Sequence, residues 1–134
     1  MAKVLTLLEQ ILTENETFSP KIDVIEYDNI YKIIIQLPGI HKKDINIRFQ
    51  GNILLLDGNY PDPEQEYVNS PENLNKILYR ETNINYGKFS RKIFLNFDIT
   101  TTNGIVSKLE NGLLTITINK NLQLQNSFSI KIND

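Results

Sequence analysis

The chain has 134 residues, of which 40% are hydrophobic and 22% charged, with a formal net charge of −2. This length suits one domain with its own core and is short for two. Because lysine and arginine are few and scattered, the charge pattern gives no reason to expect nucleic acid as a partner. The absence of cysteine excludes disulfides, thiol catalysis and cysteine-ligated zinc.

The first 17 residues are interpreted as a short N-terminal arm. Between Lys3 and Thr13 the apolar residues recur at helical spacing, and the segment Phe18-Ser19-Pro20 ends the pattern. Glu9 interrupts the apolar part and no small-residue cleavage site follows, so we expect a retained arm and a cytoplasmic protein. No apolar run approaches the ~20 residues that span a bilayer, so we expect no membrane partner. Such a helix either covers one end of its own domain or offers apolar contacts elsewhere. The apolar residues available are Val4, Leu5, Leu8, Ile11, Leu12 and Phe18.

From Lys21 onward the apolar period changes to two, which is typical of half-buried strands. Turn signals separate the runs: Pro38-Gly39, Gly51-Asn52, Asp57-Gly58 and Asn111-Gly112. Several short strands at regular spacing, with no helical pattern between them, predict an all-β, immunoglobulin-like antiparallel β-sandwich. The predicted strands span residues 21–27, 31–37, 44–49, 53–56, 87–95, 104–109 and 113–118.

Between Pro61 and Asn85 the strand pattern lapses into a long polar loop. A loop of this length in a compact domain usually has a function or contains an element of its own. The candidate element is the strand-like segment Ile77–Glu81. From the residues alone it is a strand of its own sheet, an irregular loop, or a strand offered to another subunit.

The last residues contain an apolar pair, Ile130 and Ile132, at a chain end where most domains become polar. In an extended segment these two side chains point to the same side while Lys131 points to the other. The pair either packs on its own domain or enters a groove of a neighbouring subunit. The tether from Lys120 to Ile130 spans about 30 Å if fully extended, which suffices to reach a neighbour.

The residues give no support for catalysis. The single histidine, His41, lies in a turn beside two lysines, where a solvated side chain is the expected state. No group of side chains has metal-ligand spacing, and no glycine-rich phosphate loop is present. We therefore expect neither an enzyme nor a cofactor.

Five segments together resemble the small heat-shock proteins of the α-crystallin family. They are Tyr31–Gly39 with Lys43–Ile45, Leu54–Gly58, Tyr86–Arg91, Asn111–Ile116 and Ile130–Ile132, in the family's order. The chain departs from the family pattern at Leu95-Asn96, at Ser107 and at Asn119-Lys120, which affects loops rather than the fold. The resemblance implies an α-crystallin domain at residues 18–120 and a flexible C-terminal extension at residues 121–134.

The resemblance also implies roles for particular residues. The tail pair Ile130 and Ile132 would anchor in a neighbour's groove lined by Ile45, Ile47, Ile105 and Leu109. A homodimer would form through Ile77, Tyr79, Glu81 and Arg91, with the loop strand swapped onto the partner. Alternation places Arg91 on a buried face, where a guanidinium needs an acidic partner.

The function implied is that of an ATP-independent chaperone, a holdase that covers unfolding clients and works as an exchanging homo-oligomer. The arm would contribute to client capture and assembly. The alternative is a p23-like co-chaperone or adaptor sandwich that binds one folded partner as a monomer.

Overall fold

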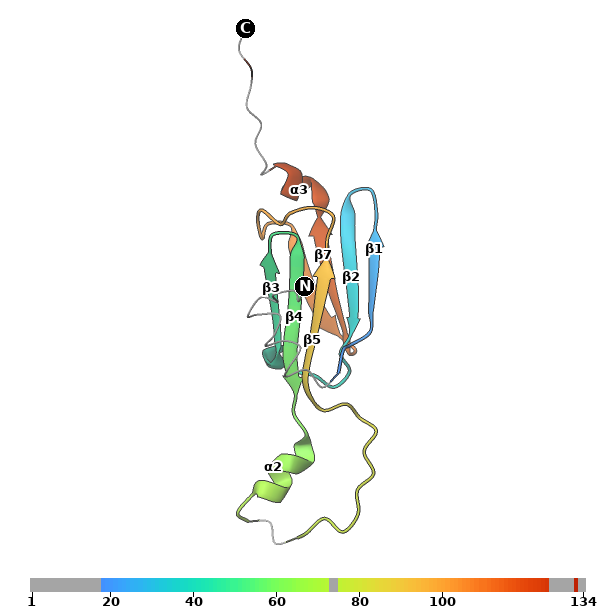
Figure 1. Ribbon diagram of the computed structural model, residues 1–134, viewed down its shortest axis with the longest axis vertical. Coiled ribbons are helices and arrows are strands. Elements are labelled where there is room, and N and C mark those ends of the chain that lie inside the picture. Colours follow the sequence, from blue (N-terminus) through green and yellow to red (C-terminus); the bar gives the residue numbers. More distant parts are fainter. Residues whose placement is uncertain (1–17, 73–74, 126–131, 133–134) are drawn as a thin grey trace, which may run out of the picture.

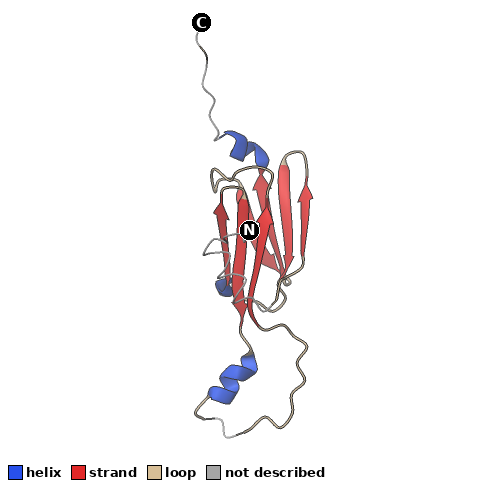
Figure 2. Cartoon of the chain, in the orientation of Figure 1, coloured by secondary structure: helices blue, strands red, loops and turns tan. Residues whose placement is uncertain are grey.

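The computed structural model describes residues 18–72, 75–125 and 132. These residues form two antiparallel sheets packed face to face (Figures 1 and 2). One sheet has the strand order β1-β2-β7-β6 and the other β3-β4-β5. The strands are β1 Ile22–Glu26, β2 Ile30–Gln36, β3 Ile45–Gln50, β4 Ile53–Tyr60, β5 Gly87–Phe94, β6 Ile105–Glu110 and β7 Leu113–Asn119; the helices are η1 Lys42–Asp44, α2 Pro63–Asn69 and α3 Lys120–Gln125.

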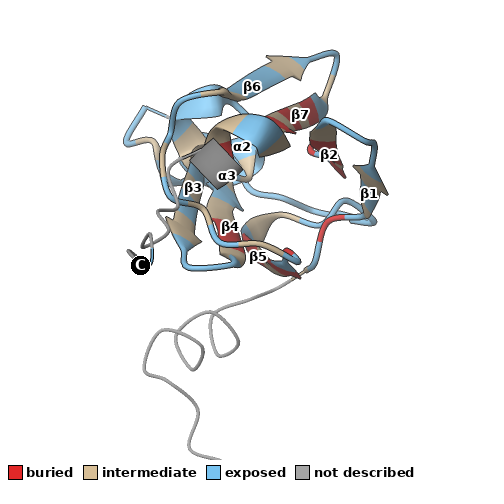
Figure 3. Ribbon diagram, turned by 90° about the horizontal axis from the view of Figure 1, so that it is seen from above, coloured by how far each residue is buried: buried red, intermediate tan, exposed pale blue. Residues whose placement is uncertain are grey.

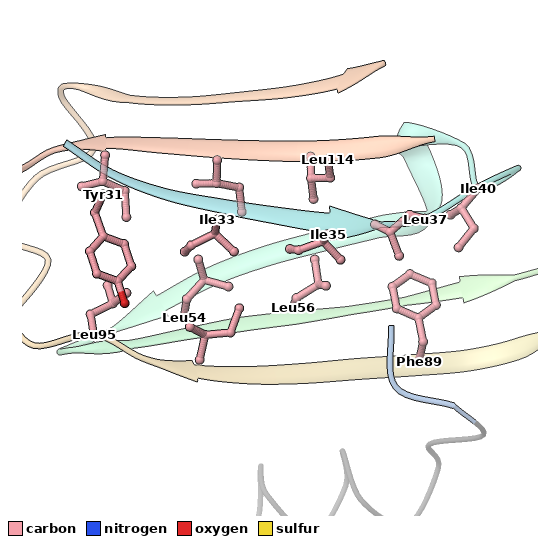
Figure 4. Packing of buried hydrophobic residues seen from close by; sticks show 13 residues of the cluster. Tyr31, Ile33, Ile35, Leu37, Ile40, Leu54, Leu56, Phe89, Leu95 and Leu114 are labelled. Atoms are coloured by element: carbon pink, nitrogen blue, oxygen red, sulfur yellow. The ribbon is translucent and has the colours of Figure 1, made fainter. Parts of the chain in front are cut away.

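The core lies between the two sheets and follows the period-two pattern of the sequence. On β2 the buried residues Tyr31, Ile33 and Ile35 alternate with half-buried ones, and β7 buries every second residue as well. Side chains from the opposite sheet, including Leu54, Leu56 and Phe89, meet them across the interior (Figure 4). Seen from above, the buried positions lie where the sheets face each other (Figure 3). The predicted antiparallel β-sandwich is confirmed.

Strand β4 is longer than the sequence predicts. Its pattern indicated an end at Asp57-Gly58, but the strand continues to Tyr60. Gly58 lies opposite both Ile45 and Phe89 in the sheet. Gly58 is therefore not a turn residue. Neighbouring atoms pack so closely against its backbone that no side chain would fit there.

The long loop contains a helix that the sequence analysis did not predict. Helix α2 begins directly after Asp62, whose side chain accepts a hydrogen bond from the amide of Glu64. Pro63 occupies the first helical turn, where its missing N–H is harmless. This Asp-Pro pair is an N-terminal helix signal that was available in the sequence.

The start of the C-terminal extension also differs from the prediction. Residues 120–125 form helix α3, which packs on the end of the sandwich instead of continuing as an extended tether. Among the helices of residues 18–72 and 75–125, none has the length and apolar character needed to cross a membrane.

Candidate functional site

A groove of about 470 Å³ lies between the outer strand of each sheet. Strand β3 ends one sheet and β6 ends the other, so each presents a backbone edge that no strand of its own sheet pairs. Apolar side chains dominate the wall on the β3 side, and polar groups stand at the rim. The lining residues are Lys42, Ile45, Ile47, Ser107, Lys108, Leu109 and Leu114.

Three of the four groove residues that the family resemblance implies come together there. Ile45, Ile47 and Leu109 line the groove and are each half-buried, so they retain apolar surface. The fourth, Ile105, does not line it: it lies at the far end of β6 and packs against the core. Ile105 and Leu109 are four residues apart on β6 and therefore face the same side of the strand, but the groove covers only one end of that face.

Sequence reasoning missed Leu114, which is buried at the back of the groove. It lies directly opposite Leu109 in the β6–β7 pairing. The Asn111-Gly112 turn was the available signal, because a hairpin of this kind makes the two leucines cross-strand neighbours.

The segment Ile77–Glu81 is not part of a strand and stands in solvent. Leu78 is 97% exposed, Tyr79 79% and Ile77 51%. The Tyr79 hydroxyl donates a hydrogen bond to Glu81 over 2.9 Å. Three adjacent apolar side chains in water are unfavourable unless another surface covers them. Neither strand pairing in its own sheet nor burial within the described residues accounts for this segment.

The base of the same loop is closed by an ion pair. Arg80 donates to both carboxylate oxygens of Asp62, at 2.7 and 3.0 Å. The guanidinium carbon of Arg80 also lies 5.7 Å from the centre of the Tyr86 ring. The centres of the Tyr86 and Tyr60 rings are 5.0 Å apart. The hydrogen bond from Arg80 lowers the pKa of Asp62. We call these four residues the loop clamp, because they join the two ends of the loop that carries Ile77–Glu81.

Arg91 is half-buried on β5, and its partner is a hydroxyl. Its Nη1 donates to Ser19 Oγ over 3.3 Å, and Ser19 Oγ lies 3.3 Å from the carbonyl oxygen of Ser90, to which it donates. Among the described residues no carboxylate forms a salt bridge with Arg91. The expected acidic partner is therefore absent from this part of the chain, and pairing with a second copy stays a prediction.

The two ends of the chain fall mostly outside the described residues. Val4, Leu5, Leu8, Ile11 and Leu12 lie there, as does Ile130. Phe18 is described: it forms an isolated bridge with Phe89, and the two rings are 5.4 Å apart. Phe18 therefore packs against the core of the sandwich. Ile132 is 92% exposed.

The described residues contain no cluster of three or more potential metal ligands. His41 is exposed at the turn before η1, as the sequence predicts.

A β-sandwich with this strand order and an apolar groove between its edge strands is an α-crystallin domain. Residues 23–133 match the model of the Hsp20/alpha crystallin family, and the chain belongs to that family. The family comprises small heat-shock proteins, which are generally chaperones and not enzymes.

Similar proteins of known family are also small heat-shock proteins. The chain is 36% identical over 104 residues to small heat shock protein C2 of Rickettsia felis, covering 78% of the chain and 62% of the relative. It is 35% identical to small heat shock protein hspG1 of Dictyostelium discoideum, covering 85% of the chain and 73% of the relative. The chain thus spans less than two thirds of the Rickettsia relative's length.

Among solved structures, heat shock protein 16.0 from Schizosaccharomyces pombe has a TM-score of 0.65 and 29% identity. The match covers 87% of the chain and 99% of that structure.

Proposed function

We propose that this protein is an ATP-independent holdase that works as an exchanging homo-oligomer. The observation that carries the proposal is the apolar groove between β3 and β6, which is open at two unpaired strand edges. Such a groove accepts an extended apolar segment, with backbone edges supplying hydrogen bonds and the pocket selecting side chains. Family membership supports the same proposal.

In this proposal the resident occupant of the groove is the Ile130–Ile132 segment of a second copy. Burying two isoleucines contributes roughly 1.5–3 kcal/mol each. Association and ordering of the tether cost several kcal/mol, so a single contact is weak. Several such contacts in one assembly add through effective concentration, which yields a particle that holds together and still exchanges subunits.

The dimeric unit of the assembly would form through the long loop. Ile77–Glu81 would pair with the free edge of β1 in a second copy, because β1 ends its sheet and has an open side. Burial of Leu78 and Tyr79 would then account for apolar side chains that otherwise stand in water. Arg91 would lie near this interface and find its acidic partner there.

Clients would be unfolding proteins that expose apolar segments. A groove from which the tail has dissociated, together with the apolar residues of the N-terminal arm, would cover such segments and prevent clients from meeting each other. Warming favours dissociation of the weak tail contacts, which makes the groove available when clients begin to unfold. This cycle needs no nucleotide and no cofactor.

The experiment is light scattering of a heat-labile client, for example citrate synthase, heated with and without this protein and without ATP. We expect suppressed scattering near a stoichiometric ratio. A matched sample of bovine serum albumin controls for crowding. Undiminished scattering from a folded, oligomeric sample would reject the holdase proposal, and a monomer would favour the partner-specific adaptor.

A further inference from the structure

Two side chains of the β3-β4-β5 sheet are buried although they point away from the core. Leu55 on β4 is 3% exposed and Ser90 on β5 is 6% exposed. They alternate with Leu54, Leu56 and Phe89, which point into the interior (Figure 4). Leu55 does not belong to the core cluster. Burial on the outer face indicates that a further layer covers this sheet.

The other sheet supplies an internal comparison. Ile34 holds the corresponding position on β2, on the outer face of an inner strand of the β1-β2-β7-β6 sheet. It is only half-buried, as is usual for the outer face of an antiparallel sheet that meets solvent. The full burial of Leu55 is therefore specific to the β3-β4-β5 sheet.

The long polar neighbours of Leu55 are directed to other residues. Its cross-strand neighbours are Arg48 on β3 and Lys92 on β5. The Arg48 guanidinium pairs with Asp57 over 2.9 Å, and the Lys92 ammonium lies 5.9 Å from the centre of the Phe94 ring. Phe94 is 63% exposed on the same face. Leu55 and Phe94 thus form an apolar strip that suits the apolar side of another segment.

The chain reaches this sheet at Phe18. Phe18 forms a parallel bridge with Phe89 at the outer edge of β5, and Ser19 Oγ donates to a β5 carbonyl oxygen over 3.3 Å. Leu55 pairs with the residue three steps further along β5, about 10 Å from Phe89 along the strand and about 4.8 Å across. Residues 14–17 span up to about 13 Å when extended, which is enough for the segment before them to reach Leu55.

The N-terminal arm, residues 1–17, lies outside the described residues, and its sequence suits this face in size, polarity and charge. Its apolar residues recur at helical spacing between Lys3 and Thr13. A helix is about 10 Å in diameter, and the outer strands of a three-stranded sheet lie about 10 Å apart. The arm has an excess of glutamates and the face an excess of basic residues, so their charges attract. The charged residues are Glu9, Glu14 and Glu16 against Lys3 in the arm, and Arg48, Lys88 and Lys92 against Asp57 on the face.

We propose that the N-terminal arm packs on the outer face of the β3-β4-β5 sheet of its own chain, with Leu55 at the centre of the contact. The short connection to Phe18 favours the chain's own arm over that of a second copy, because it keeps the local concentration of the arm high. The contact covers the apolar side of the arm and the strip on the sheet together. The consequence for function rests on the proposed holdase: the arm binds clients only after it leaves the sheet.

Proteolysis of the arm tests the contact. A glutamyl endopeptidase cleaves the full chain at the three arm glutamates, and Leu55→Ser removes the central apolar contact. We expect roughly tenfold faster cleavage of the arm, the effect of losing one buried leucine. Ile34→Ser, on the other outer face, is the control and should be cleaved at the wild-type rate. Mass spectrometry recognises general unfolding, which would also expose Glu26 on β1. Equal rates for all three proteins would overturn the proposal.

Cross-linking shows which copy supplies the arm, and it does not depend on the Leu55 variant. Because the chain has no cysteine, Leu8→Cys/Lys92→Cys carries the only two thiols. The reducible cross-linker dithiobismaleimidoethane should yield an intramolecularly linked monomer on a denaturing gel. Leu8→Cys/Lys32→Cys is the matched control, because Lys32 is also half-buried but lies on the outer face of the other sheet. Equal linkage in both variants, or a covalent dimer in place of the linked monomer, would overturn the proposal.

Light scattering of a heated client separates this inference from the holdase proposal. The linked Leu8→Cys/Lys92→Cys protein should lose suppression, and reduction of the linker should restore it, because only then can the arm leave the sheet. Equal suppression before and after reduction would overturn the withholding of the arm while the holdase stands. Absence of suppression in the wild type as well would reject the holdase alone, since the cross-link establishes the packing independently.

Discussion

Gly58 on β4 lies directly opposite Phe89 on β5, and the Phe89 ring occupies the space where a side chain at residue 58 would be. A Cβ atom on Gly58 would overlap Cζ of Phe89 and the carbonyl oxygen of Asp44. The ring of Phe89 is 1% exposed and contacts Phe18, so it has no free space into which to move. A glycine that resembles a turn residue in the sequence is therefore a packing requirement of the core.

Gly58→Ala is accordingly expected to lower the free energy of unfolding by about 1–3 kcal/mol, the usual range for overpacking. Urea denaturation followed by circular dichroism measures the change. Asn59→Ala, at the next and exposed position, is the control and should stay within about 0.5 kcal/mol of the wild type. Equal stability of the two variants would contradict the packing role of Gly58.

Ser107→Glu should block the groove without disturbing the core, because Ser107 is exposed and lines the groove. A charged side chain there would oppose burial of an isoleucine. Loss of one such burial corresponds to roughly a 10- to 100-fold weaker contact. Size-exclusion chromatography with light scattering should show the assembly breaking down to its dimeric unit.

Val106→Glu is the matched control for this variant, since Val106 is the preceding residue, is 64% exposed and does not line the groove. Its assembly should keep the wild-type mass. Should Ser107→Glu also keep that mass, the groove would not be the docking site.

The Glu26–Lys120 pair should give the fold an acid-sensitive contribution. The hydrogen bond from Lys120 is the main cause that lowers the pKa of Glu26 below its ordinary value of 4.5. Because the folded-state pKa is the lower one, the pair stabilises the fold fully above about pH 4.5. Its contribution is lost as the pH falls through the depressed folded value.

Urea midpoints of the wild type and Glu26→Gln should therefore differ at pH 7 and converge in acid below that window. Glu72→Gln, which replaces an exposed carboxyl in the long loop, controls for net charge. A difference between wild type and Glu26→Gln that persisted undiminished at pH 2 would exclude the carboxylate as its source.

Asp62→Asn should loosen the long loop while preserving the start of α2. Asparagine caps a helix as well as aspartate does, so the variant removes the charge from the pair with Arg80 and little else. Because solvent screens this exposed pair, its loss is expected to make opening of the loop only roughly two- to fivefold more frequent.

Limited trypsin digestion at the exposed Lys76 would report this opening as a two- to fivefold faster cleavage. Asp98→Asn, an exposed carboxyl outside the loop, should leave the rate unchanged. An unchanged rate for Asp62→Asn would mean that the loop clamp does not restrain the loop.

The strands themselves could be predicted because alternation is local. The spacing of Ile33 and Ile35 indicates a buried face within a few residues of sequence. One face of a sheet must be buried for the sheet to be stable. Turn pairs such as Asn111-Gly112 set which strands are neighbours, as the β6–β7 pairing bears out. The prediction of the end of β4 was wrong because glycine occurs both in turns and at close packing contacts, as at Gly58. Helix α2 was not predicted because its signal, Asp62-Pro63, is only two residues long and lies in a polar stretch.

By itself, then, the sequence determined the β-sandwich, its strands and the family to which the chain belongs, since periodicity, turn residues and short motifs are properties of neighbouring residues. The tertiary structure alone decided that Leu114 and not Ile105 lines the groove, that Arg80 pairs with Asp62, and that Gln123 fixes α3. Each of these depends on residues brought together from distant parts of the chain, and hydrogen bonds and packing act over a few ångströms in space, whatever the separation along the chain.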